Sequence, residues 1–219
     1  MKKFIAIAGN IGVGKSTLVN LLAMNLGYQP FFEPESQNPY LADFYQDMRA
    51  WAFHSQLFFL THRLRIHREL LIYPGSVIQD RSVYEDAEVF ARNLYLQGEI
   101  SERDYTTYQD LYHVLSDFLT PPDLMIYLRA SEKTLLERIA NRNRSYELSI
   151  SANYLKQLNG LYEQWISNFT LCPVLTVPSD TLDYVGHPQH LTLVINKVQE
   201  KLTGKDEVIF APEEMQSNS

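Results

Sequence analysis

Cysteine, long apolar segments and basic charge are all scarce in this sequence of 219 residues. The single cysteine, Cys172, cannot form an internal disulfide, so a reducing compartment is expected. No segment approaches the roughly 20 apolar residues of a membrane-spanning helix, and the apolar run at residues 4–8 is too short for a secretory signal. With 19 Lys and Arg against 26 Asp and Glu, the net charge of -7 argues against nucleic acid as a partner. We therefore expect a protein of the cytoplasm that binds neither membranes nor nucleic acid.

The composition is that of an ordinary globular protein, with 45% hydrophobic and 21% charged residues. Its length favours one domain, which we place at residues 1–203. Residues 204–219 read as a polar tail that we expect to be mobile.

Short apolar runs alternate with long amphipathic segments along the chain. This alternation is typical of an α/β fold in which helices flank a parallel sheet. The pattern predicts five strands, at residues 3–8, 29–32, 77–79, 124–128 and 174–177. It predicts helices at residues 15–26, 49–71, 83–97, 101–119, 131–141, 151–168 and 188–203.

Residues 9–16, Gly-Asn-Ile-Gly-Val-Gly-Lys-Ser, match the phosphate-binding pattern G-x-x-x-x-G-K-[ST] between the first strand and the first helix. The glycines let backbone N–H groups turn toward polyphosphate oxygens, Lys15 adds a positive charge, and Ser16 can bind Mg²⁺. A glycine turn that only joins strand to helix would not need Lys-Ser here. We expect a P-loop NTPase-type three-layer sandwich that binds ATP or another NTP through Gly9, Asn10, Ile11, Gly12, Val13, Gly14, Lys15, Ser16 and Thr17.

A P-loop alone does not show which reaction the triphosphate serves, so the other motifs in the chain must distinguish the classes of P-loop protein. A GTPase would carry an Asn-Lys-x-Asp base reader, but the nearest match, at residues 196–199, ends in Gln. A motor ATPase would carry an acidic pair after a strand, whereas the third strand is followed by Asp80-Arg81-Ser82. A small-molecule kinase and a non-catalytic nucleotide-binding module remain.

Charged residues follow the second and third strands, at the sheet edge where α/β proteins bind ligands. Glu33 is the candidate general base for a hydroxyl acceptor, although it could be an ordinary loop glutamate. Asp80 could bind Mg²⁺, and Arg81 could bridge the base and the acceptor oxygen; a structural ion pair is the alternative. Arg138, Arg142 and Arg144 could close over a transferring phosphoryl group as a lid at residues 138–147, or form a solvated basic face.

Taken together, these motifs resemble the deoxyribonucleoside kinases, especially bacterial enzymes acting on deoxyadenosine, deoxyguanosine or deoxycytidine. The resemblance covers about residues 3–200 and includes the P-loop, Glu33-Pro34, residues 80–86 and the arginine lid. It implies that Glu33 is the base for the 5′-hydroxyl with Arg81 as its partner. The family also implies a homodimer formed through helices such as residues 83–97 and 101–119.

The resemblance further implies residues that bind the nucleoside. Tyr45 and Glu147 match a pair that holds the sugar 3′-hydroxyl. Gln56, Arg63 and Asp86 match residues that read the base, and Phe90 matches one that packs against it. The family more often has Glu where this chain has the shorter Asp80, so we expect Asp80 to reach Mg²⁺ through water.

Helical spacing supports the base-reading residues independently. Gln56 and Arg63 are seven positions apart and so project from one face of the predicted helix. Asp86 could fix Arg63 and accept from an exocyclic amine, which favours adenine or cytosine, allows guanine and handicaps thymine. A salt bridge that only braces two helices is the alternative. Residues 180–184, Asp-Thr-Leu-Asp-Tyr, follow the fifth strand and could contact the donor base, Asp180 among them, or form an ordinary turn.

The sequence thus predicts a kinase that transfers the γ-phosphoryl of ATP, or another NTP, to the 5′-hydroxyl of a deoxynucleoside in nucleotide salvage. Purine deoxynucleosides are expected to be favoured, with deoxycytidine next. A nucleoside monophosphate kinase of the same fold would need basic residues for an acceptor phosphate, whereas Tyr45 and Glu147 suit an uncharged sugar. The other alternative is a nucleotide-binding module without turnover.

Overall fold

The computed structural model describes residues 1–32, 37–144, 147, 150–205 and 208–215. Within these residues, five parallel strands form one sheet in the order β2-β3-β1-β4-β5. The central strand β1 is buried along its whole length. Because the strands are parallel, the loops that follow them meet at one edge of the sheet. The strands are β1 Phe4–Gly9, β2 Gln29–Phe31, β3 Val77–Asp80, β4 Leu124–Arg129 and β5 Val174–Pro178.

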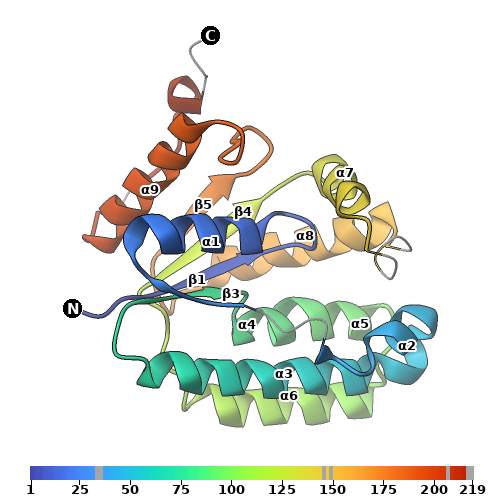
Figure 1. Cartoon of the computed structure of the whole chain (residues 1–219). Coiled ribbons are helices and arrows are strands. Elements are labelled where there is room, and N and C mark those ends of the chain that lie inside the picture. The colour runs from blue at the N-terminus through green and yellow to red at the C-terminus, as the bar shows by residue number, and fades with distance from the viewer. Residues whose placement is uncertain (33–36, 145–146, 148–149, 206–207, 216–219) are drawn as a thin grey trace.

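Helices cover both faces of the sheet, so the predicted three-layer α/β fold is confirmed. Helices α1 and α9 lie on one face, and α4, α5 and α8 lie on the other, with α3 and α6 beyond them (Figure 1). The helices are α1 Lys15–Leu26, α2 Leu41–Gln46, α3 Met48–Ile72, α4 Val83–Glu85, α5 Arg92–Leu96, α6 Glu102–Ser116, α7 Glu132–Arg142, α8 Ala152–Asn168 and α9 Pro188–Leu202, together with the π-helical η2 Asp86–Ala91 and the 3₁₀ turn η4 Pro212–Met215.

Serine side chains fix where three of these helices begin. The Oγ atoms of Ser101, Ser131 and Ser151 each accept a hydrogen bond from the backbone N–H three residues further on. Such a cap satisfies an amide that has no partner within the helix and contributes about 1 kcal/mol. The caps place α6, α7 and α8 within one residue of their predicted starts.

Two local features differ from the prediction. Helix α2 was not expected, because six residues are too few to show an amphipathic period. The helix expected at residues 83–97 is continuous in space, but its middle turns are π-helical. Such a wider turn shifts the side chains that follow it and is common at functional sites. Asp86 and Phe90 both lie in it.

The carboxyl-terminal segment, whose mobility stays a prediction, contacts the domain. In its described part, Val208, Phe210 and Met215 are partly buried against the core. The side chain of Lys197 in α9 forms an ion pair with Glu214 at 2.8 Å. Residues 208–215 therefore pack on the domain. None of the helices in the described ranges is both long enough and apolar enough to cross a membrane.

Candidate active site

The P-loop joins β1 to α1 and packs against α7. Gly12 and Gly14 have φ angles of 80° and 102°, which favour glycine. A Cβ on Gly12 would also lie 2.7 Å from the Cγ1 atom of Ile139, so a larger residue has no space there. Lys15 is only 8% exposed, and its Nζ donates to the carbonyls of Gly9 and Asn10 at 2.9 and 3.0 Å. These contacts hold the lysine over the loop in which a polyphosphate would bind.

The Asn10 side chain braces the P-loop from behind. Its Nδ2 donates to the carbonyl of Leu155 at 2.9 Å and to Oδ1 of Asn159 at 2.8 Å, both in α8. Its Oδ1 accepts from the backbone N–H of Ile11 at 2.7 Å. The Asn10 side chain thus orients the loop and is not directed at a phosphate. The backbone N–H groups of the loop remain available to bind phosphate.

Ser16 and Asp80 lie side by side at the start of α1 and the end of β3. The Ser16 hydroxyl donates a hydrogen bond to Oδ2 of Asp80. A hydroxyl and a carboxylate are the hard oxygen ligands that Mg²⁺ prefers, and Mg²⁺ at kinases is usually shared with phosphates and water. No group of three or more His, Cys, Asp or Glu side chains suited to a metal occurs in the described part of the chain. The pair therefore fits Mg²⁺ that arrives with a triphosphate.

Arg81 is held by a buried network that sequence reasoning missed. Its Nη1 donates to the hydroxyl of Tyr162 at 3.0 Å and lies 3.8 Å from Oε1 of Glu85. The Glu85 side chain is fully buried and accepts from Tyr162 at 2.8 Å and from the backbone N–H of Gly9 at 3.2 Å. The Tyr162 hydroxyl lies 2.8 Å from the Gly9 carbonyl. One carboxylate thus ties Arg81 to the first residue of the P-loop.

The backbone at Arg81 is itself unusual, with a φ of 64°. A non-glycine residue in this region costs about 1 kcal/mol or more and is often found at functional sites. The guanidinium carbon lies 4.4 Å from the centroid of the Phe90 ring. The strained backbone and the ring together direct the guanidinium into the neighbouring cavity.

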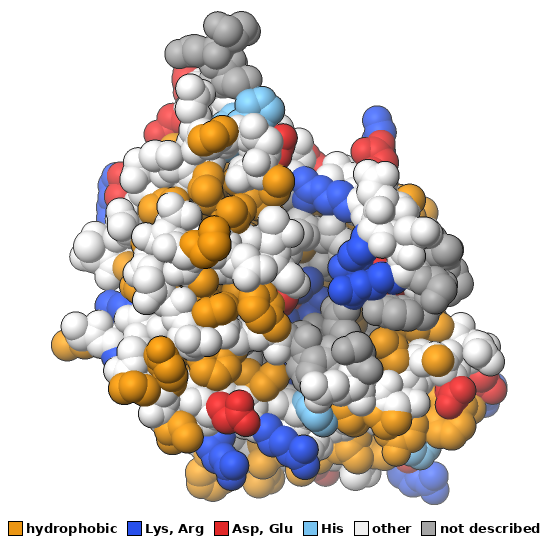
Figure 2. Space-filling model, viewed as in Figure 1, with side chains coloured by type: hydrophobic (Ala, Val, Ile, Leu, Met, Phe, Trp, Pro, Cys, Tyr) orange, Lys and Arg blue, Asp and Glu red, His pale blue; other side chains and the backbone are white. Residues whose placement is uncertain are grey.

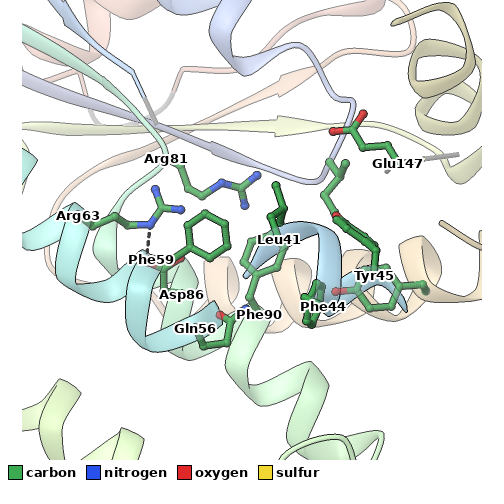
Figure 3. A pocket seen from close by; sticks show the side chains of 12 residues that line it. Leu41, Phe44, Tyr45, Gln56, Phe59, Arg63, Arg81, Asp86, Phe90 and Glu147 are labelled. Carbon is green, nitrogen blue, oxygen red and sulfur yellow. Dashed lines mark hydrogen bonds and ion pairs between the residues drawn. The ribbon is translucent and has the colours of Figure 1, made fainter. Parts of the chain in front are cut away.

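That cavity lies between α2, α3 and η2, beside the P-loop, and encloses about 570 Å³ counted out to its open mouth. Arg63, Asp86 and Gln56 lie toward one end of it, and Tyr45 and Glu147 toward the other (Figure 3). The structure thus brings together every described residue that was predicted to bind substrate: Tyr45, Gln56, Arg63, Arg81, Asp86, Phe90 and Glu147. It adds four residues that were not predicted, Leu41, Phe44, Phe59 and Tyr154, and also Ile11, which was predicted to bind the triphosphate.

The inner end of the cavity is lined by buried polar side chains. Arg63 Nε donates to Oδ2 of Asp86, and the two side chains are 3% and 2% exposed. The Gln56 side chain is 4% exposed, and its Oε1 has no hydrogen-bond partner among the described residues. Burial raises the pKa of Tyr154 to about 12, so its hydroxyl stays neutral. A ligand with a donor group could satisfy the Gln56 oxygen, and leaving it unpaired costs about 1–3 kcal/mol.

The predicted lid arginines contact both the P-loop and the cavity. Arg138 Nη1 donates to the carbonyl of Val13 at 2.6 Å. Arg142 donates from Nε and Nη2 to Oε2 of Glu147 at 3.0 and 2.5 Å. Nη1 of Arg144 lies 3.4 Å from Oε1 of the same carboxylate. Figure 2 shows Lys and Arg side chains gathered along one edge of a hollow in this face of the molecule. The arginines therefore lie between the P-loop and the cavity.

A second hollow of about 760 Å³ adjoins the P-loop, and Arg138 and Arg142 form part of its lining. Gly12, Gly14 and Thr17 line it together with residues 182–185. Asp180 does not line it: its carboxylate accepts from the backbone N–H and the hydroxyl of Ser131, at the start of α7. A contact of Asp180 with a donor base therefore stays a prediction, and of the predicted segment 180–184 only residues 182–184 line the hollow.

Glu33, the predicted base, lies outside the described residues. It follows β2 by two positions, and β2 lies beside β3, which carries Asp80 and Arg81 at its end. Its role therefore stays a prediction.

A P-loop that adjoins a cavity with buried polar side chains at its inner end, on a five-stranded parallel sheet, is the arrangement of a phosphotransferase of the P-loop class. Comparison with known proteins identifies the family. The model of the family described as deoxynucleoside kinase matches residues 5–203. The chain belongs to this family, and it is a phosphotransferase that acts on a nucleoside hydroxyl.

Individual relatives agree with this assignment. The chain is 37% identical over 196 residues to a deoxyadenosine/deoxycytidine kinase of Bacillus subtilis (strain 168), covering 89% of this chain and 90% of the relative. It is 33% identical over 201 residues to a deoxyguanosine kinase of the same organism, covering 90% and 96%. The structure of deoxyadenosine kinase from M. mycoides with bound dATP superimposes with a TM-score of 0.80 at 34% identity, covering 90% of this chain and 99% of that one.

Proposed function

We propose that this protein transfers the γ-phosphoryl of ATP, or another NTP, to the 5′-hydroxyl of a deoxynucleoside in nucleotide salvage. Purine deoxynucleosides are the favoured acceptors, with deoxycytidine next. The single observation that carries the proposal is the cavity beside the P-loop, with Gln56 and the Arg63–Asp86 pair at its closed end and Arg81 facing it from the P-loop side. The single cysteine and the net charge of -7 support a cytoplasmic enzyme without nucleic-acid partners.

In this proposal the base lies against Phe90, with its edge toward Gln56 and the Arg63–Asp86 pair. Tyr45 and Glu147 hold the 3′-hydroxyl at the other end, which orients the 5′-oxygen toward Arg81 and the P-loop. Lys15 and the P-loop amides bind the triphosphate, and Arg138, Arg142 and Arg144 neutralise the charge of the group in transfer. Glu33 accepts the 5′-hydroxyl proton.

Mg²⁺ is part of the same proposal. Ser16 and Asp80 would hold it, Asp80 through water, and the ion would supply charge neutralisation at the triphosphate oxygens. Their existing hydrogen bond already brings both oxygens to the mouth of the P-loop.

The test is transfer of label from γ-labelled ATP in the presence of Mg²⁺ to each deoxynucleoside and each deoxynucleoside monophosphate. Label is expected on deoxyadenosine, deoxyguanosine and deoxycytidine, with thymidine the poorest acceptor. Label only on the monophosphates would support a monophosphate kinase instead. No transfer, with ATP bound, would support a nucleotide-binding module.

Glu33→Gln tests the proposed base. The amide keeps the size of the side chain but cannot accept the proton, so kcat should fall by about 10²-fold with little change in ATP affinity. The measurements are kcat at saturating deoxyadenosine and a Kd for MgATP by calorimetry. Glu69→Gln is the matched control, because that glutamate is exposed on α3 and lines neither the cavity nor the hollow beside the P-loop. An undiminished kcat in Glu33→Gln would remove Glu33 from this role.

We also propose that the enzyme is a homodimer, as its resemblance implied. Two adjacent surface grooves support this, because the helices of residues 83–97 contribute to both. Glu88, Arg92 and Tyr112 line both grooves, and exposed Leu96 lies at the edge of one.

Analytical ultracentrifugation tests the dimer. The wild type is expected to sediment at about twice the chain mass of 25.4 kDa, and Leu96→Asp should shift it toward the monomer, since a carboxylate buried at the interface has no partner. Met24→Asp is the control, because Met24 is also an exposed apolar residue but lies on α1. A wild type that is monomeric at micromolar concentration contradicts the proposal.

A further inference from the structure

The loop after β5 forms one wall of the hollow beside the P-loop. Residues 182–185 line this hollow, and the Tyr184 hydroxyl lies 3.1 Å from where a Cβ on Gly14 would stand. The loop consists of turns, without a helix or strand of its own. Its shape therefore depends on what packs against it.

Helix α9 holds the second half of this loop. The backbone N–H of Asp183 donates to Nδ1 of His190 at 3.1 Å. The Asp183 carboxylate in turn accepts from the backbone N–H groups of Val185 and Gly186 at 3.1 and 2.8 Å. These bonds fix the loop from Asp183 onward.

The carboxyl-terminal segment, residues 208–215, holds the first half. The Thr181 hydroxyl lies 3.4 Å from Sδ of Met215 and 3.3 Å from the carbonyl oxygen of Pro178, and its one proton is shared between these two acceptors. One residue earlier, Glu214 pairs with Lys197 in α9 at 2.8 Å, and the Lys197 side chain is 13% exposed. The segment thus returns along α9 toward the loop, and Figure 1 shows η4 near the end of α9 where the loop arrives.

The Glu214 side chain also shapes the segment itself. Its second oxygen, Oε2, accepts from the backbone N–H of Ala211 at 2.9 Å, while the backbone N–H of Glu214 donates to the Ala211 carbonyl at 3.0 Å. The hydrogen bond from Lys197 lowers the pKa of Glu214, so the carboxylate is charged at neutral pH. One side chain therefore closes the η4 turn and anchors it to α9.

We propose that residues 208–215 act as a strut that holds the loop 181–185 in the shape that receives the nucleoside triphosphate, and that they set the affinity for the donor without affecting the acceptor. The inference rests on the proposed function, since it takes the hollow beside the P-loop as the donor site. The strut follows the residues matched by the family model, 5–203, so it is a feature of this chain beyond that match.

The test uses the full chain with Glu214→Gln and Met215→Ala combined. Calorimetry should show the Kd for MgATP rising by about 2- to 10-fold, because the loop must then be ordered on binding, while the Kd for deoxyadenosine is unchanged. Hydrogen exchange of residues 179–187 in the free protein should become faster than in the wild type. Glu213→Gln is the control, because it removes the neighbouring exposed carboxylate of the same turn.

An unchanged Kd for MgATP overturns the proposal, whatever the exchange rate does. An equal weakening of deoxyadenosine binding also overturns it, because that would reflect a general loss of structure. A wild-type protein that binds MgATP but transfers no phosphoryl group would instead contradict the proposed function, and the binding and exchange measurements would still test the strut.

Discussion

Arg81→Lys is expected to lower kcat by about 10³-fold, although the positive charge is retained. The guanidinium bonds to Tyr162, lies near Glu85 and packs over Phe90 at the same time. A lysine ammonium has no planar fork and can satisfy only part of this arrangement while it faces the acceptor oxygen. The backbone strain at this position is the same for both residues, so the substitution changes the head group alone.

The measurement is steady-state kcat with deoxyadenosine at saturating MgATP, together with the midpoint of thermal unfolding. Arg103→Lys is the matched control, since the Arg103 side chain is 89% exposed on α6, and its kcat should equal that of the wild type. If Arg81→Lys retained kcat to within about tenfold, Arg81 would serve packing and not transfer.

Replacing Arg63 and Asp86 together with apolar residues, as in Arg63→Met with Asp86→Ala, should reverse the preference between deoxyadenosine and thymidine. The ratio of their kcat/KM values is expected to fall by about 10³-fold, because a site built to hydrogen-bond a base edge strongly rejects a base that leaves its groups unpaired. Removal of both charges takes that penalty away from thymine. An unchanged order of acceptors would show that the pair only braces α3 against η2.

The single variant Asp86→Ala separates recognition from stability. It removes the carboxylate that pairs with the buried guanidinium of Arg63, and breaking a buried pair from one side should destabilise the fold by about 3–5 kcal/mol. The double variant removes both charges of the pair and should unfold closer to the wild type. Thermal denaturation of all three proteins, alongside the acceptor panel, therefore distinguishes a folding defect from a change in specificity.

The parts of the site that could be predicted from sequence are those fixed by local rules. The glycine spacing and the Lys15-Ser16 pair predicted the P-loop because its conformation depends on residues within one turn. Helical spacing placed Gln56 and Arg63 on one face of α3, and both line the cavity.

The network around Arg81 could not be predicted, because its members are far apart in the chain. Glu85 meets Gly9 across 76 positions, and Tyr162 meets Glu85 across 77. In the sequence, Glu85 reads as an ordinary first-turn acid of a helix and Tyr162 as one apolar position of α8. The Glu85 carboxylate acquires its donors only in the folded chain, where β1 and β3 pair and Glu85 follows β3.

The loop after β5 shows how far local rules reach. Residues 180–184 were predicted to contact the donor base or to form an ordinary turn, because they follow the fifth strand, and this stays a prediction. Residues 182–185 line the hollow beside the P-loop, whereas the Asp180 carboxylate accepts from Ser131. The loop also contacts α9 and Met215. Contacts from later elements decide such a loop, and no local pattern encodes them.

The central claim is that the acceptor binds in the cavity and the donor binds in the P-loop and the hollow beside it. A structure of the enzyme with deoxyadenosine and a non-reactive ATP analogue tests this claim most directly. We predict adenine in the cavity against Phe90, with Gln56 and the Arg63–Asp86 pair at its edge, and the triphosphate in the P-loop with its base toward Tyr184. Deoxyadenosine bound beside Tyr184, with the cavity between α2 and α3 empty, would contradict it.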